Sequence, residues 1–405
     1  MTPIPSFRIA LGAIRRNEFV LAPIARVFDA ERGDGVSQFF SSTKDNLRSV
    51  KNYQPGKPLE ELEREYGVKN AVKMASNENA LGPSPKAVAA MRKALLKTHR
   101  YPDGGCYYLR HKLAKFLKVA PESLVFGNGS DELLVFAVRA FVSEGDEVII
   151  ADPTFLVYEI ACAVENGRIV KVPMKNFRYD LERMKARING RTKLIFIANP
   201  DNPIGTYIKE SALAAFLSRV PAGVVVVLDE AYFEFGNIKK DYPDSVKLLK
   251  KYPNLIVTRT FSKAYGLAGL RVGYAVASEG IVNALNKVRE PFNVNLLAQE
   301  AAVAALDDRA HLNKTVKLVN EGRKFLTAAL EIMGARCVDT VTNFILADLG
   351  REAQPVYEGL LKRGVIVRPM NAWGLSRFIR VTIGTKADNK RFIDSLKKVL
   401  GSKQS

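Results

Sequence analysis

The chain has 405 residues, of which 47% are hydrophobic, and it carries a formal net charge of +19. This length exceeds what one small core holds and allows two structural domains. No apolar stretch approaches the roughly eighteen residues of a membrane span, so we expect a soluble protein with no membrane partner. The basic residues are interleaved with acids and form no RNA-binding signature, so we interpret the charge as a solvated surface without a nucleic-acid partner.

The three cysteines, Cys106, Cys162 and Cys337, are widely spaced and odd in number. Sequence neighbours therefore form neither a disulfide framework nor a C-x-x-C site, and a reducing compartment fits best. We expect a cytoplasmic protein. The histidines show no metal-ligand spacing, so no metal is predicted.

The first 45 residues differ from the rest. Residues 1–28 carry four arginines against one acid, with apolar residues between them, which loosely resembles an organelle-targeting segment. The acidic stretch at 29–34 and the lack of a cleavage site argue against targeting. A poorly ordered extension or an overcalled start codon are the alternatives, and we expect folding to begin near Val50.

From Val50 onward, apolar runs alternate with helical patterns, which predicts an α/β fold with a parallel sheet. Helical patterns occupy residues 132–142 and 210–219. Short β-branched runs without polar alternation are typical of strands buried on both faces, and they occur at 147–151, 194–198, 224–228, 255–260 and 272–277.

The chain from about Asn295 has a different pattern, in which a long helical stretch is followed by several strand candidates. These candidates lie at 344–347, 365–368 and 378–383. The change of pattern indicates a second, smaller α+β domain.

A glycine-containing turn, Gly127-Asn128-Gly129-Ser130-Asp131, follows a strand-like run and opens a helix. Backbone N–H groups and the positive end of a helix bind phosphate well. The turn lacks the spacing of a dinucleotide motif or a P-loop, so taken alone it is equally a capped glycine turn.

Lys263 lies in the run Thr260-Phe261-Ser262-Lys263, and Arg271 follows eight residues later. A lysine amine among hydroxyls and an arginine can react with an aldehyde whose phosphate these neighbours hold. This combination indicates pyridoxal phosphate chemistry.

Asp229 ends a continuous apolar run, which places its carboxylate at the C-terminal edge of a parallel sheet, where α/β folds bind ligands. There it would keep a pyridine nitrogen protonated, so that the ring accepts electrons when the substrate loses its α-proton. A strand-end turn or helix cap is the alternative if Lys263 is disregarded. Tyr232 and Asn202 could donate to the phenolic oxygen of the same ring.

Taken in order, the motifs resemble those of the fold type I, class II aminotransferases, and within that family most of all the histidinol-phosphate enzymes. The similarity runs from about Tyr53 to the C-terminus. The motifs are Ser76-Asn77-Glu78-Asn79, Gly82-Pro83-Ser84-Pro85, Arg100-Tyr101-Pro102, Gly129-Ser130-Asp131-Glu132, Asn202-Pro203, Asp229-Glu230-Ala231-Tyr232, Ser262-Lys263 and Arg271-Val272-Gly273.

The resemblance implies a large domain at 76–294 with a mainly parallel seven-stranded sheet. It implies a smaller α+β domain formed by 46–75 and 295–405, preceded by a poorly ordered extension at 1–45. It also implies a homodimer whose active sites lie at the subunit interface.

The resemblance assigns roles position by position. Lys263 would bind the cofactor covalently and move the proton, Asp229 would face the pyridine nitrogen, and Phe155 would stack on the ring. Asn202 and Tyr232 would face the phenolic oxygen. The phosphate would be bound by Ser130, Asp131, Thr260, Ser262 and Arg271, and by Tyr101 of the other subunit.

The C-terminal motifs imply the substrates. Arg380 matches an arginine that clamps carboxylates, Arg368 matches a second arginine of the histidinol-phosphate enzymes, and Tyr53 matches a tyrosine that reaches the substrate phosphate. Asn79 belongs to the same substrate-binding set. Two arginines would serve both histidinol phosphate and glutamate or 2-oxoglutarate in one cycle, which is a step of histidine biosynthesis.

Four positions depart from the family pattern: Ala80, Asp201, Ile204 and Trp373. They leave the cofactor assignment intact, although Trp373 could widen or narrow the pocket. The alternatives are an aromatic amino acid aminotransferase, a threonine-phosphate decarboxylase on the same fold, and a non-catalytic basic binding protein. The presence of both Lys263 and Asp229 argues against the last.

Overall fold

The structure is a computed structural model that describes residues 43–50 and 52–401. Residues from Ser49 onward form one compact unit. The short 3-10 helix η2 (Asp45–Ser49) lies at the start of the described chain. The targeting-like segment at 1–28 and nearly all of the extension predicted at 1–45 lie outside the described residues.

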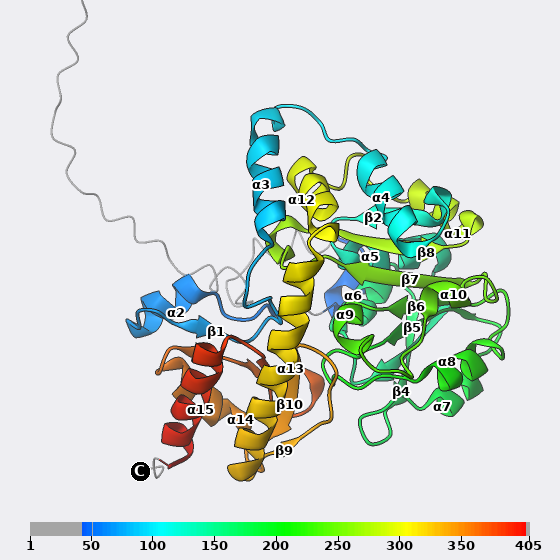
Figure 1. Ribbon diagram of the computed structural model, residues 1–405. Helices are drawn as coiled ribbons and strands as arrows, with labels where there is room; N and C mark the ends of the chain where they lie inside the picture. The colour runs from blue at the N-terminus through cyan, green and yellow to red at the C-terminus, as the bar shows by residue number, and fades with distance from the viewer. Residues whose placement is uncertain (1–42, 51, 402–405) are drawn as a thin grey trace, which may run out of the picture. The chain divides into compact units, whose positions relative to one another are not determined.

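A seven-stranded sheet occupies the first part of this unit, with the strand order β2-β8-β7-β6-β5-β3-β4 (Figure 1). Neighbouring strands are parallel except around β8, which is antiparallel to both β2 and β7. The predicted mainly parallel sheet is therefore confirmed. The strands are β2 (Leu124–Gly127), β3 (Glu147–Asp152), β4 (Arg168–Pro173), β5 (Thr192–Ala198), β6 (Val225–Asp229), β7 (Leu255–Thr260) and β8 (Gly273–Ala277).

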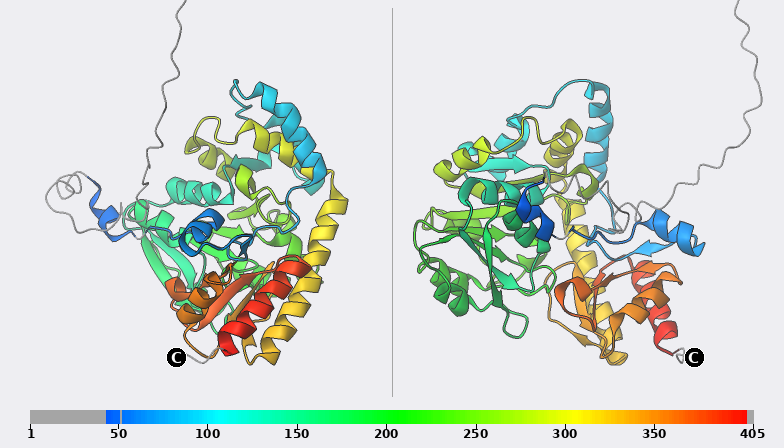
Figure 2. Two further views of the ribbon diagram at one scale, coloured as in Figure 1. Left: turned by 90° about the vertical axis from the view of Figure 1, so that its left-hand side faces the viewer. Right: turned by 180° about the vertical axis from the view of Figure 1, so that it is seen from behind.

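Helices cover both faces of this sheet because its central strands are apolar on both sides (Figure 2). Leu194 and Phe196 of β5 pack on one face, and Ile195 and Ile197 pack on the other. The first face is covered by α5 (Ser130–Phe141), α6 (Leu156–Val164) and α11 (Glu279–Lys287), and the second by α7 (Leu181–Ala186), α8 (Glu210–Leu217) and α10 (Ser245–Leu248).

A third apolar cluster joins α3 (Pro85–Ala94), α4 (Tyr107–Leu117) and α12 (Leu296–Leu306) to the β2–β8 end of the sheet. Helix α12 packs beside α3, as Figure 1 shows. The short helix α9 (Phe233–Gly236) follows β6, whereas α2 (Leu59–Tyr66) packs through Leu62 against Leu361 and Ile366 of the C-terminal part.

A four-stranded antiparallel sheet with the order β12-β13-β10-β9 follows in the chain, and a parallel pair joins β1 to β11. The strand predicted at 365–368 is split between these two sheets. This α+β part agrees with the predicted pattern, whereas the domain boundaries remain a prediction. Its elements are β1 (Val72–Lys73), α13 (Arg309–Ile332), β9 (Arg336–Cys337), β10 (Phe344–Asp348), α14 (Ala353–Leu361), β11 (Val365–Ile366), β12 (Arg368–Pro369), β13 (Phe378–Thr382) and α15 (Lys386–Gly401).

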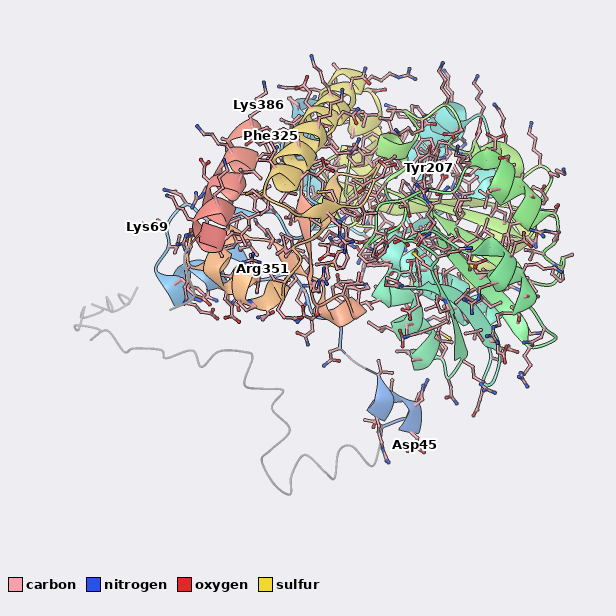
Figure 3. The ribbon with its side chains drawn as sticks, turned by 90° about the horizontal axis from the view of Figure 1, so that it is seen from below. Asp45, Lys69, Tyr207, Phe325, Arg351 and Lys386 are labelled. Atoms are coloured by element: carbon pink, nitrogen blue, oxygen red, sulfur yellow. The ribbon has the colours of Figure 1, made fainter. Side chains whose placement is uncertain are left out.

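Exposed basic side chains account for part of the charge. Lys69, Arg351 and Lys386 lie at the periphery of the C-terminal part in Figure 3 and are exposed. Among the described helices, none has the length and apolar character needed to cross a bilayer.

Candidate active site

A cavity of about 360 Å³ opens where β5, β6 and β7 end, and residues of the C-terminal sheet line its far side. The last residues of these strands, Ala198, Asp229 and Thr260, all contribute to its wall. Parallel strands bring their C-terminal ends to one edge, which explains why residues distant in sequence meet here. The cavity lies in the size range of small-molecule sites.

Lys263 enters this cavity from the turn after β7. Its Nζ donates to the Ser76 carbonyl at 3.2 Å and lies 5.8 Å from the centre of the Tyr232 ring. Burial lowers the pKa of the amine to about 8, and Arg380 and Arg271 act in the same direction against Asp131 and Glu78. About a tenth of this amine is thus neutral, and therefore nucleophilic, at pH 7, which is far more than for a lysine with the ordinary pKa of 10.5.

Asp229 lies at the end of β6 and is only 5% exposed. Its carboxylate accepts a 2.8 Å hydrogen bond from the Tyr158 hydroxyl and longer ones from Thr258 and the Ala231 amide. Burial raises its pKa to about 6, because these donors offset only part of the lost hydration. A cationic ring nitrogen beside Asp229 would restore its charged form.

A polar cradle lies beside Asp229 at the start of α5. Arg271 donates to Ser262 Oγ at 3.3 Å and forms a 3.2 Å ion pair with Asp131. Gly129 has a φ of +87°, and a Cβ there would collide with the Arg271 guanidinium. The helix N-terminus at Ser130, the hydroxyls and the guanidinium are the donor set that a phosphate prefers.

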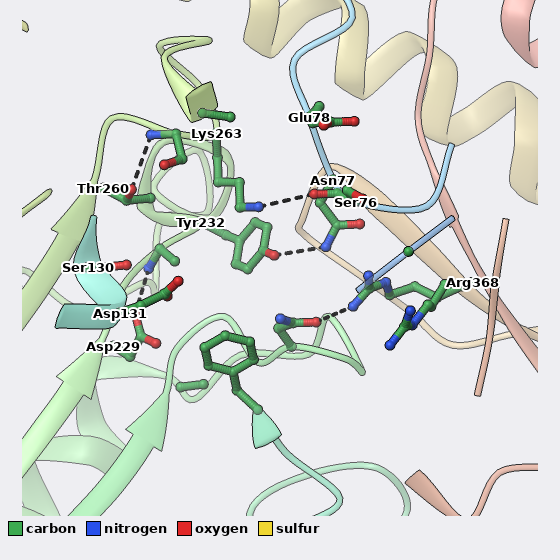
Figure 4. Close-up of a pocket in the computed structure, with 18 of the residues that line it drawn as sticks. Ser76, Asn77, Glu78, Ser130, Asp131, Asp229, Tyr232, Thr260, Lys263 and Arg368 are labelled. Carbon is green, nitrogen blue, oxygen red and sulfur yellow. Dashed lines mark hydrogen bonds between the residues drawn. The ribbon is translucent and has the colours of Figure 1, made fainter. Parts of the chain in front are cut away.

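Figure 4 shows how these groups are arranged: Ser130, Asp131, Thr260 and Asp229 lie on one side, Arg368 lies on the opposite side, and Lys263 and Tyr232 lie between them. The Tyr232 hydroxyl accepts from Asn77 Nδ2 at 2.8 Å, which leaves its own proton free to donate. Asn202 accepts from Arg380 at 2.5 Å, so its amide N–H groups remain available.

Two buried arginines form the opposite end of the cavity. Arg368 donates to the Gln54 carbonyl at 2.5 Å and Arg380 to the Ala75 carbonyl at 2.9 Å. The Nε atom of Arg380 is buried without a hydrogen-bond partner. Across residues 43–50 and 52–401, neither guanidinium is paired with a carboxylate, so this end of the cavity favours an anion.

These observations test whether pyridoxal phosphate fits the site. A lysine amine of lowered pKa, a buried carboxylate, a phosphate-type cradle and the aromatic ring of Phe155 line one cavity. The glycine at 129 lets the Arg271 guanidinium approach the backbone of this cradle, where a side chain would collide with it. The residues present therefore fit this cofactor.

Two predicted residues lie outside the cavity lining. The Asn79 side chain bonds to the Ala264 carbonyl, Thr315 and the Leu81 amide, so it holds its own segment in place, and its role in substrate binding stays a prediction. Tyr101 is 83% exposed and stacks on Phe292 at 4.9 Å, outside this chain's own cavity.

All other predicted site residues line the cavity, including the half-exposed Tyr53. Sequence reasoning missed Tyr158, which donates to Asp229 and stacks on Phe196 at 4.5 Å. Its place one helical turn after Phe155 was a usable signal, because residues three apart share a helix face. The role of Asn77 at Tyr232 was also missed, although Asn77 lies in a recognised motif.

Comparison with known proteins agrees with this geometry. The family model for aminotransferase class I and II matches residues 69–396. The chain therefore belongs to the class I and II aminotransferase family, whose members depend on pyridoxal phosphate.

Individual relatives show which members of this family the chain is similar to. The chain is 50% identical to histidinol-phosphate aminotransferase of Moorella thermoacetica over 88% of this chain and 92% of that one. It is 49% identical to histidinol-phosphate aminotransferase 2 of Carboxydothermus hydrogenoformans over 87% and 98%. These relatives place it among the histidinol-phosphate aminotransferases of that family.

A solved structure supports the fold assignment. The histidinol-phosphate aminotransferase of Sinorhizobium meliloti, in complex with pyridoxal-5'-phosphate, superimposes with a TM-score of 0.83 at 31% identity. The match covers 90% of this chain and 98% of that one.

Proposed function

We propose that this protein binds pyridoxal phosphate at Lys263 and transfers an amino group between L-histidinol phosphate and 2-oxoglutarate, as a step of histidine biosynthesis. The observation that carries the proposal is one cavity with a phosphate cradle at one end, two buried arginines without a carboxylate partner among the described residues at the other, and a nucleophilic lysine between them. Relatives about 50% identical carry the same enzyme name.

The cofactor, when bound, supplies an aldehyde and a ring that stabilises negative charge on the substrate carbon that loses its proton. Ser130, Thr260, Ser262 and Arg271 would hold its phosphate, and Asp229 would hold its ring nitrogen. Tyr158 fixes the Asp229 carboxylate from behind at 2.8 Å. Phe155 would cover one ring face.

Lys263 Nζ is the group that moves the proton. Its pKa of about 8 makes the neutral amine accessible, and the amine can take the proton from the substrate carbon and return it from the same position. The Ser76 carbonyl at 3.2 Å orients Nζ, and Tyr232 lies next to it.

Arg368 and Arg380 would bind the anionic end of either substrate. Histidinol phosphate offers a phosphate and 2-oxoglutarate offers two carboxylates, so one pair of guanidinium groups can serve both halves of the cycle. Tyr53, which lines the same end, would reach the substrate phosphate.

Exposed apolar side chains support a homodimer with shared active sites. Leu96 is 85% exposed, Tyr101 83% and Tyr108 77%, and all three lie in the 95–108 region. Such a patch is typical of an interface. Tyr101 would reach the phosphate cradle of the partner subunit.

The protein would act in the cytoplasm.

A half-reaction panel tests the proposed substrates. The cofactor-loaded protein is mixed with histidinol phosphate, glutamate, phenylalanine or threonine phosphate, and its conversion to the amino form is followed by absorbance. We expect the fastest conversion with histidinol phosphate. Faster conversion with phenylalanine would overturn the substrate, and release of carbon dioxide from threonine phosphate would overturn the reaction type.

A further inference from the structure

Trp373 is the only tryptophan in the sequence, and it lines the active-site cavity. It belongs to the 3-10 helix η6 (Asn371–Trp373), which directly follows the strand that carries Arg368. Gly374 ends η6 with a φ of +72°, a conformation that favours glycine and turns the chain back toward β13. The indole is therefore held on a short connection between two strands of the C-terminal sheet.

The indole is hydrogen-bonded to the segment that follows β3 of the larger sheet. Its Nε1 donates to the Thr154 carbonyl at 2.8 Å, one residue before Phe155. Thr154 is itself fixed, because its hydroxyl donates to the buried carboxylate of Asp201 at 2.9 Å. Trp373 also packs against an apolar cluster that contains Ile204. The indole is therefore bound to Thr154, a residue that Asp201 holds in place.

Arg368 lies over this ring, with its guanidinium carbon 5.4 Å from the ring centre. Its one other described polar contact is the 2.5 Å hydrogen bond to the Gln54 carbonyl. An arginine without a carboxylate partner depends on such neutral contacts for its orientation. An aromatic face suits this purpose because it attracts the guanidinium without neutralising its charge.

We propose that Trp373 is a positioning residue for the anionic end of the substrate: the Thr154 carbonyl anchors its indole, and the indole holds Arg368 in position to bind a phosphate. This inference rests on the function proposed above. It concerns a residue that departs from the family pattern and explains why a large aromatic side chain lies at this place.

The fluorescence of Trp373 provides a direct test, since no other tryptophan contributes. The holoenzyme is titrated with inorganic phosphate, because the bound cofactor already fills the phosphate cradle beside Asp229. We expect a saturable change in emission that disappears in Arg368→Ala. A wild-type emission unchanged up to saturating phosphate would overturn the proposal, and so would a response that persists in Arg368→Ala.

Kinetics then separate positioning from a general structural role. In Trp373→Ala we expect KM for histidinol phosphate to rise about tenfold or more while kcat changes by less than about threefold. Trp373→Phe keeps the aromatic face but loses the N–H, so its KM for histidinol phosphate should lie between those of wild type and Trp373→Ala. Histidinol, which lacks the phosphate, is the matched control substrate, and its KM should change little in either variant.

A double-mutant cycle with Arg368→Ala completes the test. If the indole acts through Arg368, Trp373→Ala adds little to the KM increase already caused by Arg368→Ala. Additive effects, or an equal loss with histidinol and histidinol phosphate, would contradict the proposal. A wild-type enzyme that does not use histidinol phosphate would overturn the proposed substrate instead, and the phosphate titration would still decide the role of Trp373.

Discussion

At the scale of single residues, burial moves the pKa values of Lys263 and Asp229 toward each other. The amine falls to about 8 and the carboxyl rises to about 6. Each shift arises mainly because burial disfavours the charged form of the group. A bound cofactor would suit both groups, since its aldehyde would react with the neutral amine and its ring nitrogen would pair with the carboxylate.

The lowered pKa of Lys263 predicts how cofactor loading depends on pH. Only the neutral amine attacks an aldehyde, so the rate of reconstitution of the apoprotein should rise with pH and level off above about 8. Stopped-flow absorbance after mixing with pyridoxal phosphate measures this rate. Lys263→Ala is the control and should show no covalent phase. A wild-type midpoint near 10.5, the ordinary lysine value, would contradict the account.

The raised pKa of Asp229 predicts a change in apoprotein stability. A carboxyl group whose pKa rises from 3.8 to about 6 on folding stabilises the folded state at low pH, and this contribution is lost as pH rises through that window. Wild-type apoprotein should therefore lose up to about 3 kcal/mol relative to Asp229→Asn between about pH 4 and pH 7. Urea unfolding of both proteins at pH 4 and pH 7 measures the difference in their free energies of unfolding. If this difference is the same at the two pH values, the pKa of Asp229 is not raised.

At the scale of elements, the turn before α5 shows how backbone conformation creates the phosphate cradle. Gly129 has a φ of +87° and its Cα faces the Arg271 guanidinium, whereas Gly145 has a φ of +80° with nothing within 4 Å. Alanine is strained at both positions because φ is positive, and at 129 the ψ of 170° adds a conformation that is essentially restricted to glycine. Only at 129 does the new methyl group also meet the Arg271 guanidinium of the cradle.

Gly129→Ala should therefore weaken pyridoxal phosphate binding by about tenfold or more, whereas Gly145→Ala should leave it within about twofold. Equilibrium titration of each apoprotein with the cofactor measures both values. Gly145→Ala is the control for a substitution at a positive-φ glycine away from the cradle, and urea unfolding of both apoproteins separates lost binding from lost stability. Equal weakening in the two variants would show that the cradle does not depend on space at 129.

The elements that sequence predicted well are those with a local signal. The buried strands β3, β5, β6 and β7 each contain an apolar run of three or more residues, and the ends of β6 and β7 carry Asp229 and Thr260 into the site. The edge strand β4 (Arg168–Pro173) was not predicted, because it is partly exposed and carries two basic residues.

Contacts between distant segments could not be predicted from sequence in the same way. The bond from Trp373 to Thr154 joins residues 219 apart, and Asn77 reaches Tyr232 across 155 residues. No local pattern encodes such pairs. Nor does the motif that contains Asn79 indicate that its side chain bonds to Ala264 and Thr315, more than 180 residues away in the chain.

At the scale of the whole molecule, the exposed Tyr101 predicts that two subunits share each active site. Tyr101→Ala and Lys263→Ala should each be nearly inactive as homodimers. When they are mixed, each heterodimer contains one site with both native residues, so activity should return to about a quarter of the wild-type value. Activity after unfolding and refolding the mixed subunits measures this. No recovery would contradict shared sites.

The dimer itself is tested by a charged substitution in the exposed region. Leu96→Asp should convert the protein to monomers, whereas Ile332→Asp, at a residue that is 86% exposed near the end of α13, should leave the assembly unchanged. Light scattering coupled to size-exclusion chromatography measures the mass of each variant. Dimers that persist in Leu96→Asp would place the interface elsewhere.

Trapping the bond between Lys263 and the cofactor tests whether this lysine carries it. The protein is loaded with pyridoxal phosphate, reduced with borohydride, digested and analysed by mass spectrometry. We expect one modified peptide, with the added mass on Lys263. A modification on a different lysine, or none at Lys263 in protein that catalyses amino transfer, would contradict it.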